Sequence, residues 1–498
     1  MDFLDPIKTK KRDRRLLMGY FLFAVLISLG TVILVYLSYG FGLDKKGGVY
    51  QNGLLYIASA PTGANIWLDK TSYGKTNNRI NIPSGKFMLS INKSGYREWQ
   101  RSIEVDGGSV QHFDYPLLIP NKLISSNLTS YSTLPTMELQ SPDRRWLLVQ
   151  NQSSLASFSE YDLNTKPLIK PVSITIPNGI LTTVPGGGDN LKLVEWSTDN
   201  VHILLIHSTP NGNEYILLNR QTPADSINLN KSLNLPNVNT VISLADNKYD
   251  QYYVYNQDTK VLYRNSLSSI SPVKVLSGVL SYKTYGSKMV LYASNEKVNS
   301  SEVAIRLLDD TTNYNIRTFA AGSTYLLDMA QNNGNWFVAT GSTLDNRVYV
   351  YENPEQTLQQ DQSQILAPVD ILKVDGVSYI KFSADTTKIL ANNGTSIETY
   401  DDFTNNNYSF TLAEALDLPQ KNVTWMDGER LIFVSANNVY IIDYDGTNQQ
   451  KLTSDSSYIT PIFNQNYNYL YTVTPTLTKD KLPNFSLQQT PLKISSDL

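Results

Sequence analysis

Histidine, cysteine and paired acidic residues supply many catalytic and metal-binding side chains, and this sequence is poor in the first two. It contains no cysteine and three histidines. The lack of cysteine excludes disulfides, thiolate nucleophiles, zinc–thiolate sites and iron–sulfur clusters. His202 and His207 lie five residues apart in a predicted strand, so their side chains face opposite sides and cannot chelate one metal. His112 lies on another predicted strand, and we interpret all three as ordinary strand residues.

Other reactive patterns are equally weak. Serine and aspartate are abundant, so counting alone leaves a Ser-His-Asp triad open, but no G-x-S-x-G motif is present. The run Gly186–Gly188 is not followed by Gly-Lys-Ser/Thr, which indicates a loop and not a phosphate cradle. Acidic pairs such as Asp309-Asp310 and Asp401-Asp402 would point apart on a strand. We therefore expect no catalytic residue, no cofactor and no bound metal.

Composition indicates an all-β protein of two or three domains. The 498 residues exceed one ordinary core, and the 32 tyrosines, with many threonines, favour strands. Tyrosine-rich surfaces can bind sugars, but ordinary sheet composition is the favoured explanation of these tyrosines. The first 15 residues hold six basic and three acidic residues; the rest has 36 basic and 42 acidic residues, a net charge of −6. An acidic body argues against nucleic-acid binding.

Residues 16–43 contain no charge, and about 20 apolar residues suffice to cross a bilayer. We therefore predict a transmembrane helix over 16–43 after a basic cytoplasmic tail, 1–15. The larger positive cluster stays in the cytoplasm, which places the remaining chain outside. The topology-determining residues are Lys8, Lys10, Lys11, Arg12, Arg14 and Arg15, and the anchor is represented by Leu16, Phe21, Leu26, Val32 and Leu37.

A cleaved signal peptide is the competing interpretation of this segment. Signal peptides usually have a shorter apolar region, of about 7–15 residues, that ends at small residues. Here the apolar run is longer and ends in SYGFGL, without an A-x-A pattern. The pattern favours an uncleaved signal anchor in a cytoplasmic membrane, crossed once.

Short β-rich segments alternate with turns after a linker at 44–52. Six candidate strands within 53–118 predict a small antiparallel sandwich. The turn residues and their spacing resemble those of the PEGA domain: Pro61, Gly63, Ala64, Gly74, Pro83, Gly85, Gly95 and Tyr96. Thr62 stands where that family usually has an acid, and a proline after Thr76 is missing. The resemblance implies an envelope-protein module that acts as a spacer or binds a ligand. Trp67 and Tyr96 are large enough to fill its core.

Residues 119–490 repeat a unit of an apolar strand, a turn and a second apolar strand, followed by a tail at 491–498. The clearest turn aspartates are Asp143, Asp199, Asp385 and Asp427, and successive turns lie 39 to 56 residues apart. A four-stranded propeller blade needs about 40–45 residues, so the repeat predicts seven or eight blades. A stack of sandwich domains is the rival fold.

The repeat resembles the blades of WD-like and Tol-system propellers, a resemblance that implies architecture and no particular ligand. The aspartates are expected to cap turns with their own side chains. For Asp443 and Asp445 a structural turn is favoured over a cation site.

The leading hypothesis from the sequence is a noncatalytic cell-envelope protein. The helix would anchor it, the PEGA-like domain would space it from the membrane, and the propeller would bind an envelope protein or cell-wall glycan. The alternative is a propeller-type hydrolase or lyase acting on envelope polymers, which requires charged groups that converge near the propeller axis. A sensor is a third class, but the short cytoplasmic tail would need a signalling partner.

Overall fold

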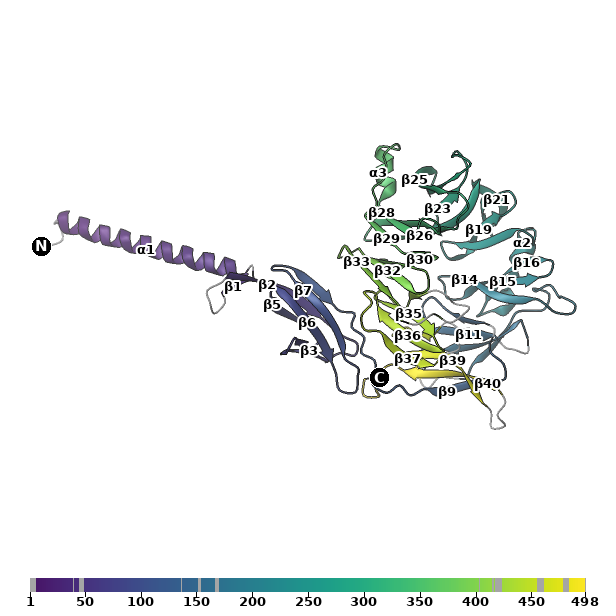
Figure 1. Cartoon of the computed structure of the whole chain (residues 1–498), viewed down its shortest axis with the longest axis horizontal. Helices are drawn as coiled ribbons and strands as arrows, with labels where there is room; N and C mark the ends of the chain where they lie inside the picture. The colour runs from purple at the N-terminus through teal and green to yellow at the C-terminus, as the bar shows by residue number, and fades with distance from the viewer. Residues whose placement is uncertain are drawn as a thin grey trace. The chain divides into compact units, whose positions relative to one another are not determined.

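The computed structural model describes residues 6–38, 40–43, 49–135, 137–150, 154–165, 170–402, 404–413, 416, 423–454, 461–477 and 483–497. The chain divides into two compact units (Figure 1). Unit 1 comprises Met1–Lys122 together with Lys493–Asp497, and unit 2 comprises Leu123–Leu492. The sequence-based boundaries at 118/119 and 490/491 therefore lie a few residues away, and part of the expected C-terminal tail belongs to unit 1.

Helix α1 (Pro6–Ser38) contains the predicted anchor. Arg12–Ser38 is long and apolar enough to cross a membrane, and none of its strongly apolar window is buried within the protein. Leu16, Phe21, Leu26, Val32 and Leu37 are all exposed. A helix that is apolar on all sides and has no protein cover matches lipid surroundings.

The helix ends earlier than the uncharged run in the sequence. The Gly40 amide donates to the carbonyl of Leu37 at 3.1 Å, and Gly40 has a φ of 79°, which glycine tolerates without steric cost. Phe41–Leu43 then forms β1 and pairs with the next strand. The predicted span of 16–43 is thus too long at its C-terminal end.

The described residues of unit 1 form two four-stranded sheets, as expected for a sandwich. One sheet has β1, β2 (Val49–Ile57) and β5 (Asn78–Pro83), with β8 (Val110–Phe113) also pairing with β2. The other has the order β4 (Thr71–Lys75), β3 (Asn65–Leu68), β6 (Gly85–Asn92) and β7 (Trp99–Val105). Two details differ from expectation: β8 runs parallel to β2, and the segment around Gly74 is the strand β4 and not only a turn.

The core of unit 1 lies between these sheets. Alternate residues of the strands point inward, including Leu55, Ile66 and Ile91, which are completely buried. Tyr96 joins this core as expected, but its largest buried aromatic is Trp99, which is 1% exposed. Trp67 is only half-buried and does not belong to this core cluster.

Unit 2 is a β-propeller whose described residues form eight four-stranded sheets, numbered here as blades 1 to 8. The first four blades are as follows: blade 1, β10 (Glu138–Gln140), β11 (Trp146–Gln150), β12 (Ser157–Asp162) and β13 (Val172–Thr175); blade 2, β14 (Asn190–Trp196), β15 (His202–Thr209), β16 (Gly212–Asn219) and β17 (Ile227–Asn228); blade 3, β18 (Thr240–Ala245), β19 (Lys248–Asn256), β20 (Val261–Ser266) and β21 (Ser269–Leu276); blade 4, β22 (Val279–Tyr285), β23 (Met289–Ser294), β24 (Glu302–Asp309) and β25 (Thr312–Ala320).

The remaining blades follow the same order: blade 5, β26 (Tyr325–Asn332), β27 (Asn335–Ser342), β28 (Arg347–Glu352) and β29 (Asp370–Lys373); blade 6, β30 (Tyr379–Phe382), β31 (Lys388–Asn392), β32 (Ser396–Asp401) and β33 (Asn406–Thr411); blade 7, β34 (Thr424–Trp425), β35 (Arg430–Ser435), β36 (Asn438–Asp443) and β37 (Gln450–Ser454); blade 8, β38 (Ile462–Phe463), β39 (Tyr469–Leu477), β40 (Pro483–Pro491) and β9 (Ser126–Tyr131). Short helices lie in the connections: η1 (Pro223–Asp225), α2 (Leu229–Ser232) and α3 (Pro354–Gln360).

The second strand of each blade explains the aliphatic half of the sequence repeat. Every residue of β23, β31 and β35 is buried, because blades cover both faces of the sheet. In Figure 1 the first strands β14, β26 and β30 lie toward the middle of unit 2, whereas β16, β21 and β33 lie at its rim. The first strand β26 contacts the first strands of both neighbouring blades, β22 and β30.

The ring is closed by a strand from the start of unit 2. Strand β9 pairs antiparallel with β40, with Thr129 opposite Leu487, and supplies the outer strand of blade 8. An apolar cluster then joins blade 8 to blade 1 through Leu147, Val149, Tyr471 and Leu487. The prediction of seven or eight blades therefore resolves to eight, with the terminal blade shared between the two ends of the unit.

Candidate functional site

The predicted turn aspartates all lie between the first and second strands of their blades. Asp199 Oδ1 accepts hydrogen bonds from the amides of Val201 and His202 at 2.9 and 3.0 Å. Asp427 Oδ1 accepts from the amides of Glu429 and Arg430, both at 2.8 Å. These carboxylates hold turns, which is the role that short acidic side chains commonly have.

The other two turns use a serine as well. Ser141 donates to Asp143, whose Oδ1 also accepts from the Arg145 amide at 3.1 Å. Ser383 donates to Asp385 in the same way, at 2.5 Å. The Ser-x-Asp pattern of the sequence is therefore a structural turn in blades 1 and 6.

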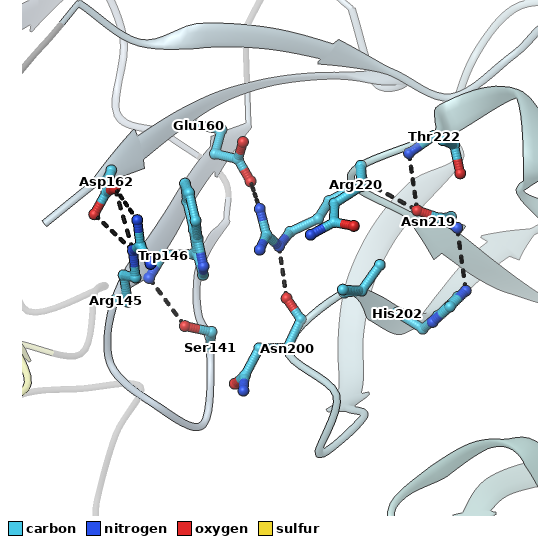
Figure 2. Close-up of polar contacts among 12 residues, drawn as sticks. Ser141, Arg145, Trp146, Glu160, Asp162, Asn200, His202, Asn219, Arg220 and Thr222 are labelled. Carbon is cyan, nitrogen blue, oxygen red and sulfur yellow. Dashed lines mark hydrogen bonds and ion pairs between the residues drawn. The ribbon is translucent and has the colours of Figure 1, made fainter. Parts of the chain in front are cut away.

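Figure 2 shows how such a turn connects blades 1 and 2. The indole of Trp146 lies between two guanidinium groups, with ring centroids 4.7 Å from Arg145 and 3.9 Å from Arg220. Arg220 also donates to Glu160 at 2.7 Å and to the carbonyl of Asn200 at 2.6 Å. Its side chain is 4% exposed, so this ion pair is a buried clamp between blades and not an open binding site.

His202 and His207 have separate partners. His202 Nδ1 lies 2.6 Å from Asp199 Oδ2. Its Nε2 lies 3.2 Å from the Asn219 side-chain nitrogen, a contact drawn in Figure 2. Because the Asn219 amide nitrogen is a donor, Nε2 accepts and Nδ1 carries the proton.

His207 is completely buried between two carboxylates. Its Nε2 lies 2.9 Å from Asp189 and its Nδ1 lies 3.2 Å from Glu214. The hydrogen bond from His207 keeps the pKa of Asp189 below its usual range. Asp189 directly follows Gly186–Gly188, so its hydrogen bond to His207 ties the end of this loop to β15 of blade 2.

His112 is exposed and stacks on Tyr56 at a ring distance of 4.7 Å. In the described part of the chain, the histidine hydrogen bonds go to carboxylates and an amide and not to a serine hydroxyl. The geometry therefore assembles no Ser-His-Asp triad from these residues. Among the same residues, no cluster of three or more His, Cys, Asp or Glu side chains could hold a metal.

Asp443 and Asp445 also form a turn. Asp445 Oδ1 accepts from the amide and hydroxyl of Thr447, at 3.1 and 2.7 Å. Asp443 Oδ2 accepts from the Asn448 side chain at 2.9 Å. Their oxygens are occupied by donors from the chain, as in a structural turn.

The first strands of the blades form the candidate site. A first strand has a β partner on only one side, so its other edge carries unpaired backbone groups that need partners. Side chains from neighbouring blades supply them. Asp328 accepts from the Phe382 amide at 2.8 Å, and Glu195 accepts from the Leu244 amide. Trp425 Nε1 donates to the Lys381 carbonyl at 2.8 Å. We call Glu195, Tyr282, Lys283, Asp328, Tyr379 and Lys381 the inner-strand cluster.

Lysine and tyrosine are the accessible members of this cluster. Lys283 Nζ lies 3.6 Å from Asp328 Oδ1, but the lysine side chain is 46% exposed and the aspartate side chain only 9%. Lys381 is exposed. Tyr282 and Tyr379 are half-buried, and their hydroxyls lie 3.5 and 3.4 Å from Ser243 and Thr424 of the adjacent blades.

Several carboxylates of the propeller have perturbed acidities. Burial raises the pKa of Glu195 above its usual value. It raises the pKa of Glu138 to about 8 and the pKa of Glu429 to about 7. These three carboxylates do not converge on one site. Glu138 lies opposite Val149, on the face of blade 1 that packs against blade 8, and Glu429 pairs with Lys388 at 2.9 Å. Glu195 already accepts a backbone hydrogen bond. Sequence reasoning missed this cluster, because nothing in a strand sequence marks which edge faces the axis.

The remaining predicted residues lie in unit 1. Gly63 and Gly95 have φ values of 75° and 87°, as tight turns require. Gly74, within β4, and Gly85, the first residue of β6, also have positive φ values, 91° and 153°, which favour glycine. Ala64 is completely buried, Pro61 lies in the connection between β2 and β3, and Pro83 is the last residue of β5. Arg12, Arg14 and Arg15 are exposed on α1. Lys8, Lys10 and Lys11 lie in its first turns, and their side chains are outside the described residues.

Comparison with known proteins supports the two domains separately. Residues 52–119 match the PEGA domain model, which confirms the resemblance seen in the sequence. No curated protein sequence matched the chain.

Solved structures with similarity to this chain are β-propellers. The β-propeller domain of Myceliophteria thermophila Cps50 (Swd1) is 11% identical, with a TM-score of 0.36 and coverage of 67% of this chain and 100% of that chain. An oligogalacturonate lyase in complex with manganese is 11% identical, with a TM-score of 0.40 and coverage of 75% and 99%. Porphyromonas gingivalis dipeptidyl peptidase 4 is 12% identical, with a TM-score of 0.44 and coverage of 68% and 56%. These proteins differ in activity, so the likeness concerns the fold alone.

The capping role of Asp328 gives a stability prediction. Asp328→Ala leaves the buried Phe382 amide unpaired, which should lower the free energy of unfolding by about 1–3 kcal/mol. Asp328→Asn keeps an acceptor oxygen and should cost less than about 1 kcal/mol. Asp225→Ala is the control at an exposed position. Urea unfolding of the full chain in detergent measures all three, and equal losses for Ala and Asn would contradict the capping role.

Proposed function

We propose that this chain is a noncatalytic cell-envelope protein, anchored in the cytoplasmic membrane by α1, whose propeller binds an envelope protein or cell-wall glycan. The observation that carries the proposal is that the carboxylates of the inner-strand cluster already accept backbone hydrogen bonds. Asp328 and Glu195 are both occupied by backbone amides of the next blade. A general acid or base must lie within hydrogen-bond distance of the reacting group of the substrate. Carboxylates that hold backbone amides of the propeller are poorly placed for that role.

The charges left accessible on the first strands favour a negatively charged partner. Lys192, Lys283 and Lys381 are exposed on these strands, whereas Asp328 is almost covered. Half-buried tyrosines beside the lysines offer flat apolar surface with a polar hydroxyl, which suits both sugars and protein loops. An acidic wall polymer and an acidic protein surface share this chemistry.

The PEGA domain and the helix support the envelope location. Residues 52–119 belong to the domain type, and α1 is long and apolar enough to span a membrane. In the proposed topology the basic residues before Leu16 stay in the cytoplasm and both folded units lie outside. The hydrolase or lyase alternative lacks a convergent set of free carboxylates in the part of the chain that the structure describes.

Binding should depend on the exposed lysines. The double substitution Lys283→Ala and Lys381→Ala should weaken retention on isolated cell-wall fragments, or capture from a detergent extract of membranes, by about tenfold or more. Cosedimentation with the wall fragments measures retention, and a pull-down with the full chain measures capture from the extract. Lys274→Ala, on the rim strand β21, is the matched control and should have no effect. Equal binding by the double variant and the control would contradict the proposed site.

Topology can be tested because the chain contains no cysteine. Thr9→Cys should react with a membrane-impermeant maleimide only after cell lysis, whereas Ser300→Cys, at an exposed propeller position, should react on cells whose outer layers admit the reagent. Both labels should appear on a full-length, membrane-bound chain, because an uncleaved anchor retains residue 9. Labelling of Thr9→Cys before lysis, or its loss from the mature chain, would contradict the anchor.

A further inference from the structure

The chain returns to unit 1 at its C-terminal end. After Leu492, which is completely buried in the propeller, Lys493–Asp497 belongs to unit 1. Ile494 packs against the apolar core of the PEGA domain. The amide of Asp497 donates to the carbonyl of Ile494 at 2.9 Å, so the segment folds into a turn that presents the Asp497 carboxylate.

Two side chains of the PEGA domain hold this carboxylate. Lys93 Nζ lies 2.6 Å from Asp497 Oδ1, and the Tyr96 hydroxyl donates to Oδ2 at 2.8 Å. The Tyr96 oxygen in turn accepts from the Ile494 amide at 2.9 Å. The Lys93 and Asp497 side chains are 23% and 17% exposed, so the pair is shielded from much of the solvent. Charge-assisted hydrogen bonds of this kind are stronger than neutral ones.

The same loop also holds the segment that leaves unit 1. The Arg97 amide donates to the carbonyl of Ile119 at 2.8 Å, and the Asn121 amide donates to that of Gly95 at 2.9 Å. Within unit 1, the segments Ile119–Asn121 and Ile494–Asp497 therefore both contact the loop Lys93–Arg97. A loop with only a turn function would not need a matched ammonium and hydroxyl for one carboxylate.

We infer that Lys93 and Tyr96 form a carboxylate-binding site of unit 1 whose occupant is the C-terminal segment of this same chain, Lys493–Asp497, and that this segment docks and releases reversibly. The docked contacts are an ion pair, hydrogen bonds and the packing of one apolar side chain, Ile494. Because none of them belongs to a β-ladder, the segment can release while the sheets of unit 1 stay paired. This inference is independent of what the propeller binds.

The lowered pKa of Asp497 makes the Lys93–Asp497 ion pair sensitive to pH. The hydrogen bond from Lys93 lowers the pKa of Asp497, and burial raises the pKa of Tyr96 to about 12. A carboxyl whose pKa is lower in the docked state stabilises docking above its usual titration range. That stabilisation is lost as the pH falls through the lowered value. Docking should therefore persist at neutral pH and open in acid.

A spin label reports the docking directly in the full chain. Ser495 is exposed, and Ser495→Cys provides a single labelling site because the natural sequence has no cysteine. At neutral pH the label should show restricted motion. Adding Lys93→Met with Tyr96→Phe should lower the docked-to-free ratio about tenfold or more. Circular dichroism should show that these variants keep their sheets.

The matched control is Lys86→Met, which breaks the exposed Lys86–Glu104 pair of the same unit and should leave the label restricted. Asp497→Asn should weaken docking and abolish the added release in acid. A freely moving label in the parent chain at neutral pH would overturn the inference. So would an unchanged, restricted label in the folded Lys93→Met/Tyr96→Phe variant.

Discussion

The pairing of β9 with β40 is the constraint on which unit 2 depends. Each blade buries both faces of its middle strands against its neighbours, so an open ring would expose the apolar faces of blades 1 and 8. Strand β9, from the start of the unit, completes the last sheet by pairing with β40, whose Leu487 packs in one apolar cluster with Leu147 and Val149. Closure thus lets sequence-distant segments share one core, at the usual entropic cost of a nonlocal contact.

Closure also determines what the acidic residues do. A ring of first strands creates unpaired edges toward the middle, and Asp328 and Glu195 satisfy amides on those edges. These carboxylates therefore have a structural role, whereas Lys283 and Lys381 have accessible ammonium groups. In unit 1, too, an acidic side chain is held within the protein, because Lys93 and Tyr96 bind the chain's own Asp497.

Local signals in the sequence predicted the local features well. The uncharged run predicted α1, turn glycines such as Gly63 and Gly95 predicted the PEGA domain, and Asp143, Asp199, Asp385 and Asp427 marked the first turn of four blades. The nonlocal features were beyond these signals. Nothing near Thr129 indicates that it pairs with Leu487, and nothing near Asp497 indicates Lys93 as its partner. The sequence predicted Trp67 as a core residue, but the structure buries Trp99 instead. Strand register, and not residue size, decides which side chains face the core.

Hydrogen exchange in the full chain tests the role of ring closure most directly. Thr129→Pro interrupts the β9–β40 ladder, because proline lacks an amide donor and fits a ladder poorly. If closure supports the whole propeller, protection should fall in blades 3 and 4, far from the seam, for example in the buried strand β23. Protection lost only in blades 8 and 1, with β23 unchanged, would show that the blades are stable without the closing strand.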